Sequence, residues 1–204
     1  MGSKTLAPTA RQGEILDRAI ELIRESGLAG LTMKKVAERM GFTEPAVYRH
    51  FPTKQALLLG IVGRLGQMLL GPIREIAARS DLPPAERLER IVSHHLGLII
   101  ETNGLPVLLL MEASVSEDEA LVQAMTDVAR TYLGIAGSVL GELGLPADAP
   151  PPGRMALPFL GLAAAVALQR RLMPDMAMPK EEALSLVRFL VGCVTASCHE
   201  EGKS

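Results

Sequence analysis

Apolar residues recur at helical spacing along nearly the whole chain. Between residues 14 and 24, apolar positions 15, 16, 19, 22 and 23 share one face of a helix, and charged residues occupy the opposite face. Gly27 follows and predicts the end of this first helix. No segment alternates apolar and polar residues between turn residues, so the sequence predicts no strand. The pattern therefore indicates an all-α fold.

Glycine and proline residues divide the rest of the chain into further helices. The expected helices span residues 32–40, 43–50, 54–79, 84–102, 105–114, 117–143, 154–173 and 180–200. Pro72 lies inside the long helix 54–79 and predicts a kink there. Residues 149–153, Ala-Pro-Pro-Pro-Gly, predict a loop. The glycines between positions 134 and 144 either let another helix approach closely or weaken the end of helix 117–143.

Residues 31–57 show the pattern of a helix-turn-helix. Val36 and Met40 give the first short helix an inner face, and Val47 and Phe51 give the second helix one. Gly41 suits the positive φ of a tight turn between them. The second helix would project Glu44, Ala46, Tyr48 and Arg49 outward. A helix fits the major groove of DNA, where residues near its N-terminus reach the base edges.

Polar groups suited to phosphate surround this predicted helix. Thr32, Thr43, Tyr48 and His50 can donate hydrogen bonds, and Lys54 adds charge to the start of the next helix, which is itself a site favourable to anions. Lys34 is a further candidate for DNA contact, although a solvated helix face explains this residue equally well.

This segment resembles the DNA-binding domain of the TetR (tetracycline-repressor-like) family of bacterial transcription regulators. The resemblance rests on Leu-Thr at 31–32, Val-Ala-Glu-Arg-Met-Gly-Phe-Thr at 36–43, Ala-Val-Tyr-Arg-His-Phe at 46–51, and Lys54 with Ala56-Leu57. With the preceding helix it covers about residues 11–60. The resemblance implies an N-terminal three-helix DNA-binding domain, placed at residues 9–55, and a C-terminal helical domain for ligand binding and dimerisation, placed at 56–204.

The resemblance also assigns roles to single residues. Tyr48, His50 and Lys54 fall on the family's phosphate-clamping positions, and Thr32 falls on a cap that contacts the DNA backbone. The base-reading positions correspond to Thr43, Glu44, Pro45, Ala46 and Arg49. Glu44 brings a carboxylate to the groove, where it would accept from a cytosine amino group or pair with a lysine or arginine.

Charge divides unevenly along the 204 residues. Residues 1–64 carry ten lysines and arginines and six acidic residues, whereas residues 65–204 carry eleven and seventeen. A basic N-terminal part suggests a polyanionic partner. The longest uncharged stretch, residues 155–169, is shorter than the roughly 20 residues of a membrane span, so we expect no membrane contact and a cytoplasmic protein. Cys193 and Cys198 fit small apolar packing better than metal binding or redox sensing, and no cofactor is indicated.

The two adjacent histidines differ in helical position. His95 shares a face with apolar residues, so we expect it buried, either in the core or lining a pocket. His94 shares its face with Arg87, Arg90 and Glu101, so we expect it in solvent. The apolar stripes of the C-terminal part either fill a core or surround a cavity for a hydrophobic ligand. The candidate pocket residues are Met68, His95, Leu98, Met111, Glu112, Met125 and Tyr132.

The last two predicted helices carry apolar residues on more than one face. Two such helices from each of two subunits would form a four-helix interface, as the family resemblance implies. The candidate interface residues are Leu160, Ala164, Leu168, Leu184, Val187, Val191 and Val194. A two-fold homodimer would bind a palindromic operator in double-stranded DNA.

The sequence therefore predicts a DNA-binding transcriptional regulator, a repressor released by a small, largely apolar effector. The alternatives are a helical adaptor that binds proteins and an enzyme with a DNA-targeting head. No Ser-His-Asp pattern, metal cluster or phosphate loop favours an enzyme.

Overall fold

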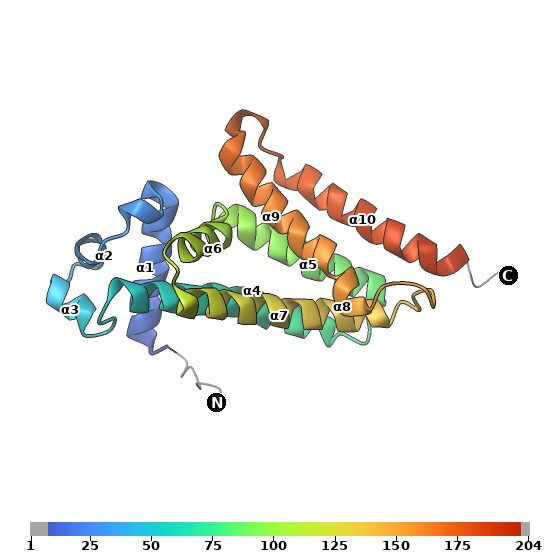
Figure 1. Cartoon of the computed structure of the whole chain (residues 1–204), viewed down its shortest axis with the longest axis horizontal. Coiled ribbons are helices and arrows are strands. Elements are labelled where there is room, and N and C mark those ends of the chain that lie inside the picture. The colour runs from blue at the N-terminus through green and yellow to red at the C-terminus, as the bar shows by residue number, and fades with distance from the viewer. Residues whose placement is uncertain (1–7, 201–204) are drawn as a thin grey trace. The chain divides into compact units, whose positions relative to one another are not determined.

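The computed structural model describes residues 8–200, with side chains described for residues 8–196. These residues form helices joined by turns and include no strand, which confirms the all-α prediction (Figure 1). The helices are α1 (Ala10–Ser26), η1 (Leu28–Gly30), α2 (Met33–Met40), α3 (Glu44–Tyr48), α4 (Lys54–Ala77), α5 (Pro84–Glu101), α6 (Leu105–Val115), α7 (Glu119–Gly141), α8 (Pro152–Met155), α9 (Leu157–Leu172), η2 (Pro174–Met176) and α10 (Lys180–Glu200). Cys198 was considered in the sequence, but its side chain lies outside the described residues.

Local capping explains why the first helices begin and end where they do. The Thr9 hydroxyl accepts from the Gln12 backbone N–H, and the Gln12 side chain accepts from the Thr9 N–H, so α1 starts in a reciprocal capping box. Thr32 caps α2 with a single bond, because its hydroxyl accepts from the Lys35 N–H at 3.2 Å. Gly41 ends α2 in the left-handed conformation, with φ of 68°, as its position predicts.

The structure corrects the predicted helix start at residue 117 and the predicted loop 149–153. The predicted helix 117–143 begins at Glu119, because Glu117 lies in a turn with φ of 54° and the Asp118 carboxylate accepts from the Leu121 N–H. The predicted loop 149–153 already contains the start of α8 at Pro152. The predicted helix 154–173 is accordingly divided into α8 and α9, and Pro158 lies in the first turn of α9, where a missing N–H costs little.

The chain divides into two compact units. We call residues 1–65 with 108–124 the head unit, and residues 66–107 with 125–204 the body unit. Three helices, α4, α6 and α7, have residues in both units. The functional division predicted at residues 55 and 56 stays a prediction.

The head unit has a small apolar core from α1, α2, α3 and the first part of α4. Its buried residues include Ile15, Leu16, Ala19, Leu31, Val36, Val47, Phe51, Leu57 and Ile61. At the edge of this core Arg64 of α4 donates two hydrogen bonds to the Asp17 carboxylate of α1, at 2.8 and 3.0 Å. This bidentate pair holds α1 against the helix that leaves the head.

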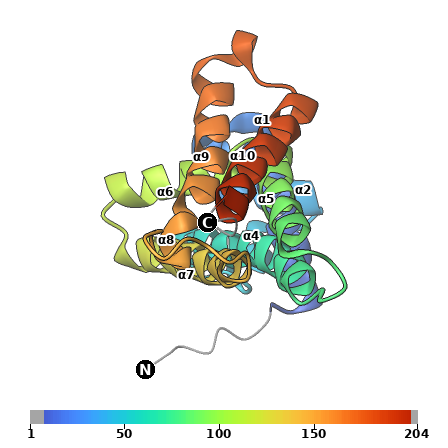
Figure 2. The same cartoon turned by 90° about the vertical axis from the view of Figure 1, so that its right-hand side faces the viewer.

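The body unit has a larger core among α4, α5, α7, α9 and α10. Helix α5 packs against both α9 and α10, which form a hairpin joined by η2 (Figures 1 and 2). A Cβ at Gly137 would lie 3.0 Å from the backbone of Gly153, so this α7 glycine permits close approach of α8. Of the two roles considered for the α7 glycines, close approach is confirmed at Gly137.

Two segments are apolar over a greater length than the longest uncharged stretch of the sequence indicated. By length and composition alone, residues Lys54–Ala77 and Pro152–Leu172 could each cross a membrane. The most apolar part of Lys54–Ala77 is 50% buried inside the protein, whereas that of Pro152–Leu172 is only 28% buried. The second segment therefore leaves much apolar surface that the single chain does not cover.

Candidate nucleic-acid interface and effector-binding body

The helix-turn-helix is built by α2, the turn at Gly41 and α3. Helix α2 packs against both α1 and α3. The Phe42 N–H donates to the Ala37 carbonyl at 2.8 Å, which closes the end of α2 and directs the chain into α3. Val47 is fully buried and Phe51 is nearly so, which confirms the predicted inner face of the second helix. This anchoring fixes which face of α3 is presented to solvent.

The structure leaves the predicted DNA-contacting side chains accessible. Seven of them are exposed: Thr32, Lys34, Thr43, Pro45, Tyr48, Arg49 and Lys54. Glu44, Ala46 and His50 are half-buried. All ten lie between the N-cap of α2 and the first residue of α4, within the head unit. Helix α3 itself has five residues, three fewer than the helix 43–50 expected from the sequence.

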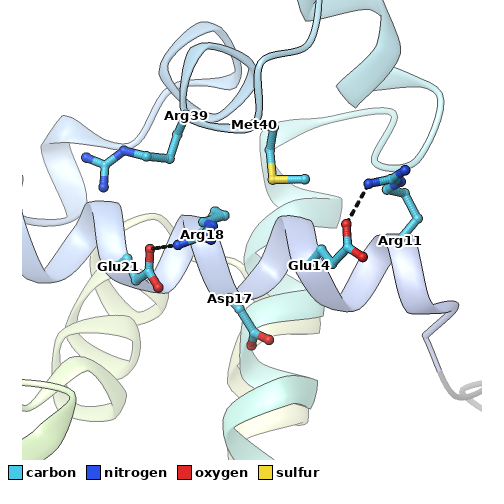
Figure 3. Close-up of a pocket in the computed structure, with 7 residues that line it drawn as sticks. All are labelled: Arg11, Glu14, Asp17, Arg18, Glu21, Arg39 and Met40. Atoms are coloured by element: carbon cyan, nitrogen blue, oxygen red, sulfur yellow. Dashed lines mark hydrogen bonds and ion pairs between the residues drawn. The ribbon is translucent and has the colours of Figure 1, made fainter.

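A second charged face of the head unit lies along α1 and the end of α2 (Figure 3). Here Arg11 pairs with Glu14 at 2.6 Å and Arg18 pairs with Glu21 at 2.8 Å. The Arg11 guanidinium also lies over the Phe42 ring, 5.2 Å from its centre, which ties α1 to the turn of the helix-turn-helix. Because its charges pair with one another, this face supports the position of α2 and is not a candidate ligand site.

Arg39 extends the pairing toward the end of α1. It donates to both carboxylate oxygens of Glu25, and this bond lowers the pKa of Glu25 and raises the pKa of Arg39. The pair is exposed to solvent, so it positions side chains more than it stabilises the fold.

The body unit brings two of the predicted pocket residues together in its core. The rings of His95 on α5 and Tyr132 on α7 lie 4.7 Å apart, and both side chains are buried, as expected for His95. Among residues 8–196, neither His95 Nδ1 nor the Tyr132 hydroxyl has a hydrogen-bond partner. Burial, with a smaller contribution from His94, lowers the pKa of His95 to about 4, and burial raises the pKa of Tyr132.

The other predicted pocket residues are dispersed. Leu98 is buried, and Met68 and Met125 are half-buried. Met111 and Glu112 are exposed on the part of α6 that belongs to the head unit. The structure therefore does not place these two side chains in the cluster around His95 and Tyr132. An almost wholly apolar run at residues 105–111 concealed that α6 presents one face to solvent.

A groove of about 490 Å³ lies among α4, α5 and α10 in the body unit. Its lining residues are Met68, Ser93, His94, Gly97, Leu98, Glu101, Lys180 and Leu184. The expectation that His94 lies in solvent was wrong, because the side chain is half-buried and its Nε2 lies 2.9 Å from the Met68 carbonyl oxygen. From the sequence, Pro72 predicted only a kink. Because proline has no N–H, however, the carbonyl four residues earlier, that of Met68, lacks its helical donor, and this is the carbonyl that His94 contacts.

Arg87 is a second side chain that the helical pattern misplaced. It was grouped with the solvent-facing residues of α5, but only 6% of the residue is exposed. Its guanidinium donates to the Ala77 carbonyl at 2.9 Å and to both carboxylate oxygens of Glu142. Arg87 thus connects the ends of α4 and α7 to α5.

The predicted interface residues have different positions on α9 and α10. The interface prediction required surface residues. Val187 and Val191 do not meet this requirement, because both are buried in the core of the chain itself. Leu168 is exposed, and Leu160, Ala164, Leu184 and Val194 are half-buried. The exposed apolar residues on or near these helices also include Leu157, Leu172, Met173, Met176 and Phe189. The apolar residues on several faces of these helices indicated more apolar surface than one chain can bury. They did not show which face of each helix stays exposed to solvent.

A helix-turn-helix head with an accessible α3, joined by α4 to a helical body, defines a DNA-binding protein of the transcription-regulator class. Residues 15–61 match the family model described as bacterial regulatory proteins, tetR family. The chain is 25% identical to the fatty acid metabolism regulator protein of Bacillus subtilis over 130 aligned residues, and these residues make up 63% of this chain. That alignment spans 66% of the length of the relative.

Solved structures show the same fold over nearly the whole chain. A TetR/AcrR-family transcriptional regulator from Thermobifida fusca is 25% identical, with a TM-score of 0.67 over 90% of this chain and 97% of that one. The regulator FadR from Bacillus subtilis, in complex with stearoyl-CoA, has a TM-score of 0.71 at 18% identity over 94% of this chain and 100% of that one. Residues 15–61 of the chain therefore match the DNA-binding domain of the TetR family of bacterial transcription regulators, and the fold of the whole chain is similar to that of TetR-family regulators.

Proposed function

We propose that this regulator is a homodimeric repressor that binds a palindromic operator and is released by a small, largely apolar effector. The proposal rests on the orientation of α3 in the head unit. Val47 and Phe51 are buried and anchor this helix, whereas the side chains of Tyr48, Arg49 and Lys54 are exposed to solvent. The N-terminal residues of α3, with Thr43 and Arg49, would read base edges in the major groove, while Tyr48, His50 and Lys54 would contact phosphates. We further propose that the protein acts in the cytoplasm and is not an enzyme.

The effector would bind in the body unit. The core there is apolar, and it contains the unpartnered polar atoms of His95 and Tyr132 and borders the groove lined by Met68 and Leu98. Sites for small molecules combine apolar walls with a few polar groups in this way. Two similar proteins, a fatty acid metabolism regulator and a FadR in complex with stearoyl-CoA, support an effector with a long apolar part.

Effector binding could reach the DNA through helices shared by the two units. Helix α4 begins at Lys54 in the head unit and continues to Ala77 in the body unit. Within the head unit, Gln55 next to Lys54 donates to both carboxylate oxygens of Asp118, at 3.1 and 3.0 Å, and Asp118 caps α7. An effector that binds one arrangement of these helices more tightly shifts the population of DNA-competent dimers.

A second copy of the chain would cover the apolar surface of α9 and α10. Leu157, Leu168 and Phe189 are exposed there, and a symmetric four-helix contact would bury them. Two heads related by a two-fold axis would then reach two half-sites of an inverted repeat.

The test is fluorescence anisotropy with the DNA upstream of the gene that encodes this chain. We expect tight binding to a fragment with an inverted repeat, weak binding to a fragment in which one half-site is scrambled, and release by stearoyl-CoA or a shorter apolar compound. Equal affinity for the intact and scrambled fragments would disprove sequence-specific binding by a dimer. Affinity that no apolar compound changes would disprove effector control.

A further inference from the structure

Pro72 creates an unusual hydrogen-bonding requirement within α4. In an α-helix the carbonyl of residue 68 accepts from the N–H of residue 72, but proline has no N–H. His94 of α5 meets this need, because its Nε2 lies 2.9 Å from the Met68 carbonyl oxygen. A carbonyl only accepts, so Nε2 carries the hydrogen in this bond. In the neutral ring Nδ1 is then an acceptor.

The same two residues line the groove among α4, α5 and α10. Met68, Leu98 and Leu184 provide apolar walls, while Ser93, His94 and the Glu101–Lys180 ion pair provide polar groups. The volume of about 490 Å³ lies within the range of roughly 300–1,000 Å³ that is usual for small-molecule sites. A Cβ at Gly97 would meet no atom within 4 Å, so the groove is open above this turn of α5.

We propose that this groove is the effector site and that it binds an apolar molecule carrying a hydroxyl or amine group, with the His94 imidazole as its polar contact. The proposal rests on the proposed function and assigns the residues and the ligand chemistry of its effector. It differs from the pocket predicted from the sequence, because His94 replaces His95 and only Met68 and Leu98 are retained.

The lining determines which polar group the ligand carries. The acceptor Nδ1 of His94 calls for a hydrogen-bond donor, which a hydroxyl or an amine supplies and an ionised carboxylate does not. The Glu101 carboxylate adds negative charge beside it. Its 3.6 Å pair with Lys180 is exposed on both sides and therefore holds Glu101 only weakly. The groove thus favours alcohols and amines over acids of the same chain length.

The position of His94 connects this site to α4. A ligand that hydrogen-bonds to the ring acts on the group that satisfies the Met68 carbonyl, one turn before Pro72. The same helix carries Lys54 at its N-terminal end. Occupation of the groove would therefore favour a different geometry of α4 at Pro72 and lower the affinity for DNA.

The experiment is isothermal titration calorimetry of the full chain with decan-1-ol, decylamine and decanoate, since the chain has no tryptophan to report binding by fluorescence. The blocking variant is Gly97→Leu, which extends a side chain into the groove from a position where a Cβ meets no atom within 4 Å. Its matched control is Gly134→Leu on α7 of the body unit, where a Cβ likewise meets nothing within 4 Å. A third variant, His94→Leu, removes the polar contact.

We expect decanol and decylamine to bind the wild type and Gly134→Leu at least about tenfold more tightly than decanoate. Gly97→Leu should abolish binding, and His94→Leu should weaken decanol by up to about tenfold, which corresponds to one hydrogen bond. Decanol should also reduce the affinity of the wild type for the upstream DNA.

Several results would overturn this assignment. Decanoate binding as tightly as decanol would refute the ligand chemistry. Unchanged decanol binding by Gly97→Leu, or no binding of any probe to the wild type, would refute the site. Decanol that binds in the groove without changing DNA affinity would refute the effector role. The DNA affinity without ligand is measured separately, so failure of DNA recognition remains distinguishable from failure of the groove assignment.

Discussion

His95 and Tyr132 place their rings 4.7 Å apart in the core of the body unit, tilted by 56°. The two side chains bury an imidazole nitrogen and a hydroxyl group that find no hydrogen-bond partner in the part of the chain that the structure describes. An unsatisfied buried polar group costs about 1–3 kcal/mol, so this pair makes the surrounding core less stable than an apolar pair of the same shape would. Two measurable consequences follow from this arrangement.

The first consequence is acid sensitivity that depends on His95. Its pKa is lowered to about 4 by burial, with a smaller contribution from His94, whereas the unfolded chain has a histidine pKa near 6.5. Between these values the unfolded state binds more protons, so the free energy of unfolding falls as the pH falls from about 6.5 to about 4. Above pH 6.5 the His95 ring is neutral in both the folded and the unfolded state, so it contributes no pH dependence to the free energy of unfolding.

We expect His95→Leu to lose this dependence. Chemical denaturation from pH 8 to pH 4 should show the wild type losing up to about 3 kcal/mol more than the variant across that window. The difference between the two proteins should be constant from pH 7 to pH 8, which serves as the internal control. Parallel curves down to pH 4 would mean that His95 is protonated in the folded state.

The second consequence concerns the Tyr132 hydroxyl. Tyr132→Phe removes an unpartnered buried group and leaves the ring in place, so the free energy of unfolding should rise by about 1 kcal/mol. Thermal denaturation measures this change. Tyr48→Phe, the same substitution at the exposed tyrosine of the head unit, should change stability by less than about 0.5 kcal/mol. A destabilised Tyr132→Phe would show that the hydroxyl has a buried water as its partner.

The helix-turn-helix could be read closely from the sequence because its determinants are local. Thr32 caps α2, Gly41 takes a positive φ, and Val47 and Phe51 turn inward, each as expected. These features depend on neighbouring residues in the chain. The short α3 could not be delimited as well, because Arg49 keeps helical dihedral angles just beyond its end.

The body unit was harder to predict because its polar groups are placed by distant partners. Helical position alone put Arg87 and His94 in solvent. Arg87 is buried by Glu142 and the end of α4, and His94 binds a carbonyl left open by Pro72. Similarly, the sequence pattern could not distinguish Val187 and Val191 from surface residues, because α10 is apolar on both faces. Only its packing against α5 determines which face of α10 is buried.

Breaking the Arg87 connection should destabilise the body unit. Arg87→Met keeps the length of the side chain but removes the donors to Ala77 and Glu142, which should lower the free energy of unfolding by about 1–3 kcal/mol. Arg79→Met breaks an exposed pair with Asp81 and is the matched control, with an expected change below about 0.5 kcal/mol. Equal effects of the two variants in urea denaturation would contradict a structural role for Arg87.

Lys54 provides a quantitative test of the proposed phosphate contacts. Lys54→Ala should weaken binding to specific and nonspecific DNA by similar factors and reduce the slope of log affinity against log salt concentration by about one. Arg130→Ala removes an exposed cation from α7 of the body unit and should leave the slope unchanged. A Lys54→Ala slope identical to that of the wild type would mean that this residue does not contact phosphate.

The exposed apolar surface of α9 and α10 gives the final prediction. Phe189 is 65% exposed and Leu168 is 39% exposed, so a glutamate at either position is tolerated by the single chain but places a charge in the proposed dimer interface. We expect Phe189→Glu with Leu168→Glu to reduce the mass measured by light scattering from twice 21.8 kDa to 21.8 kDa. The double variant should also bind an inverted repeat no better than a single half-site.

Val115→Glu, at an 84% exposed position of the head unit, should remain a dimer. If the double variant stays dimeric, the subunits associate through another surface, and the spacing of the two α3 helices must be set elsewhere.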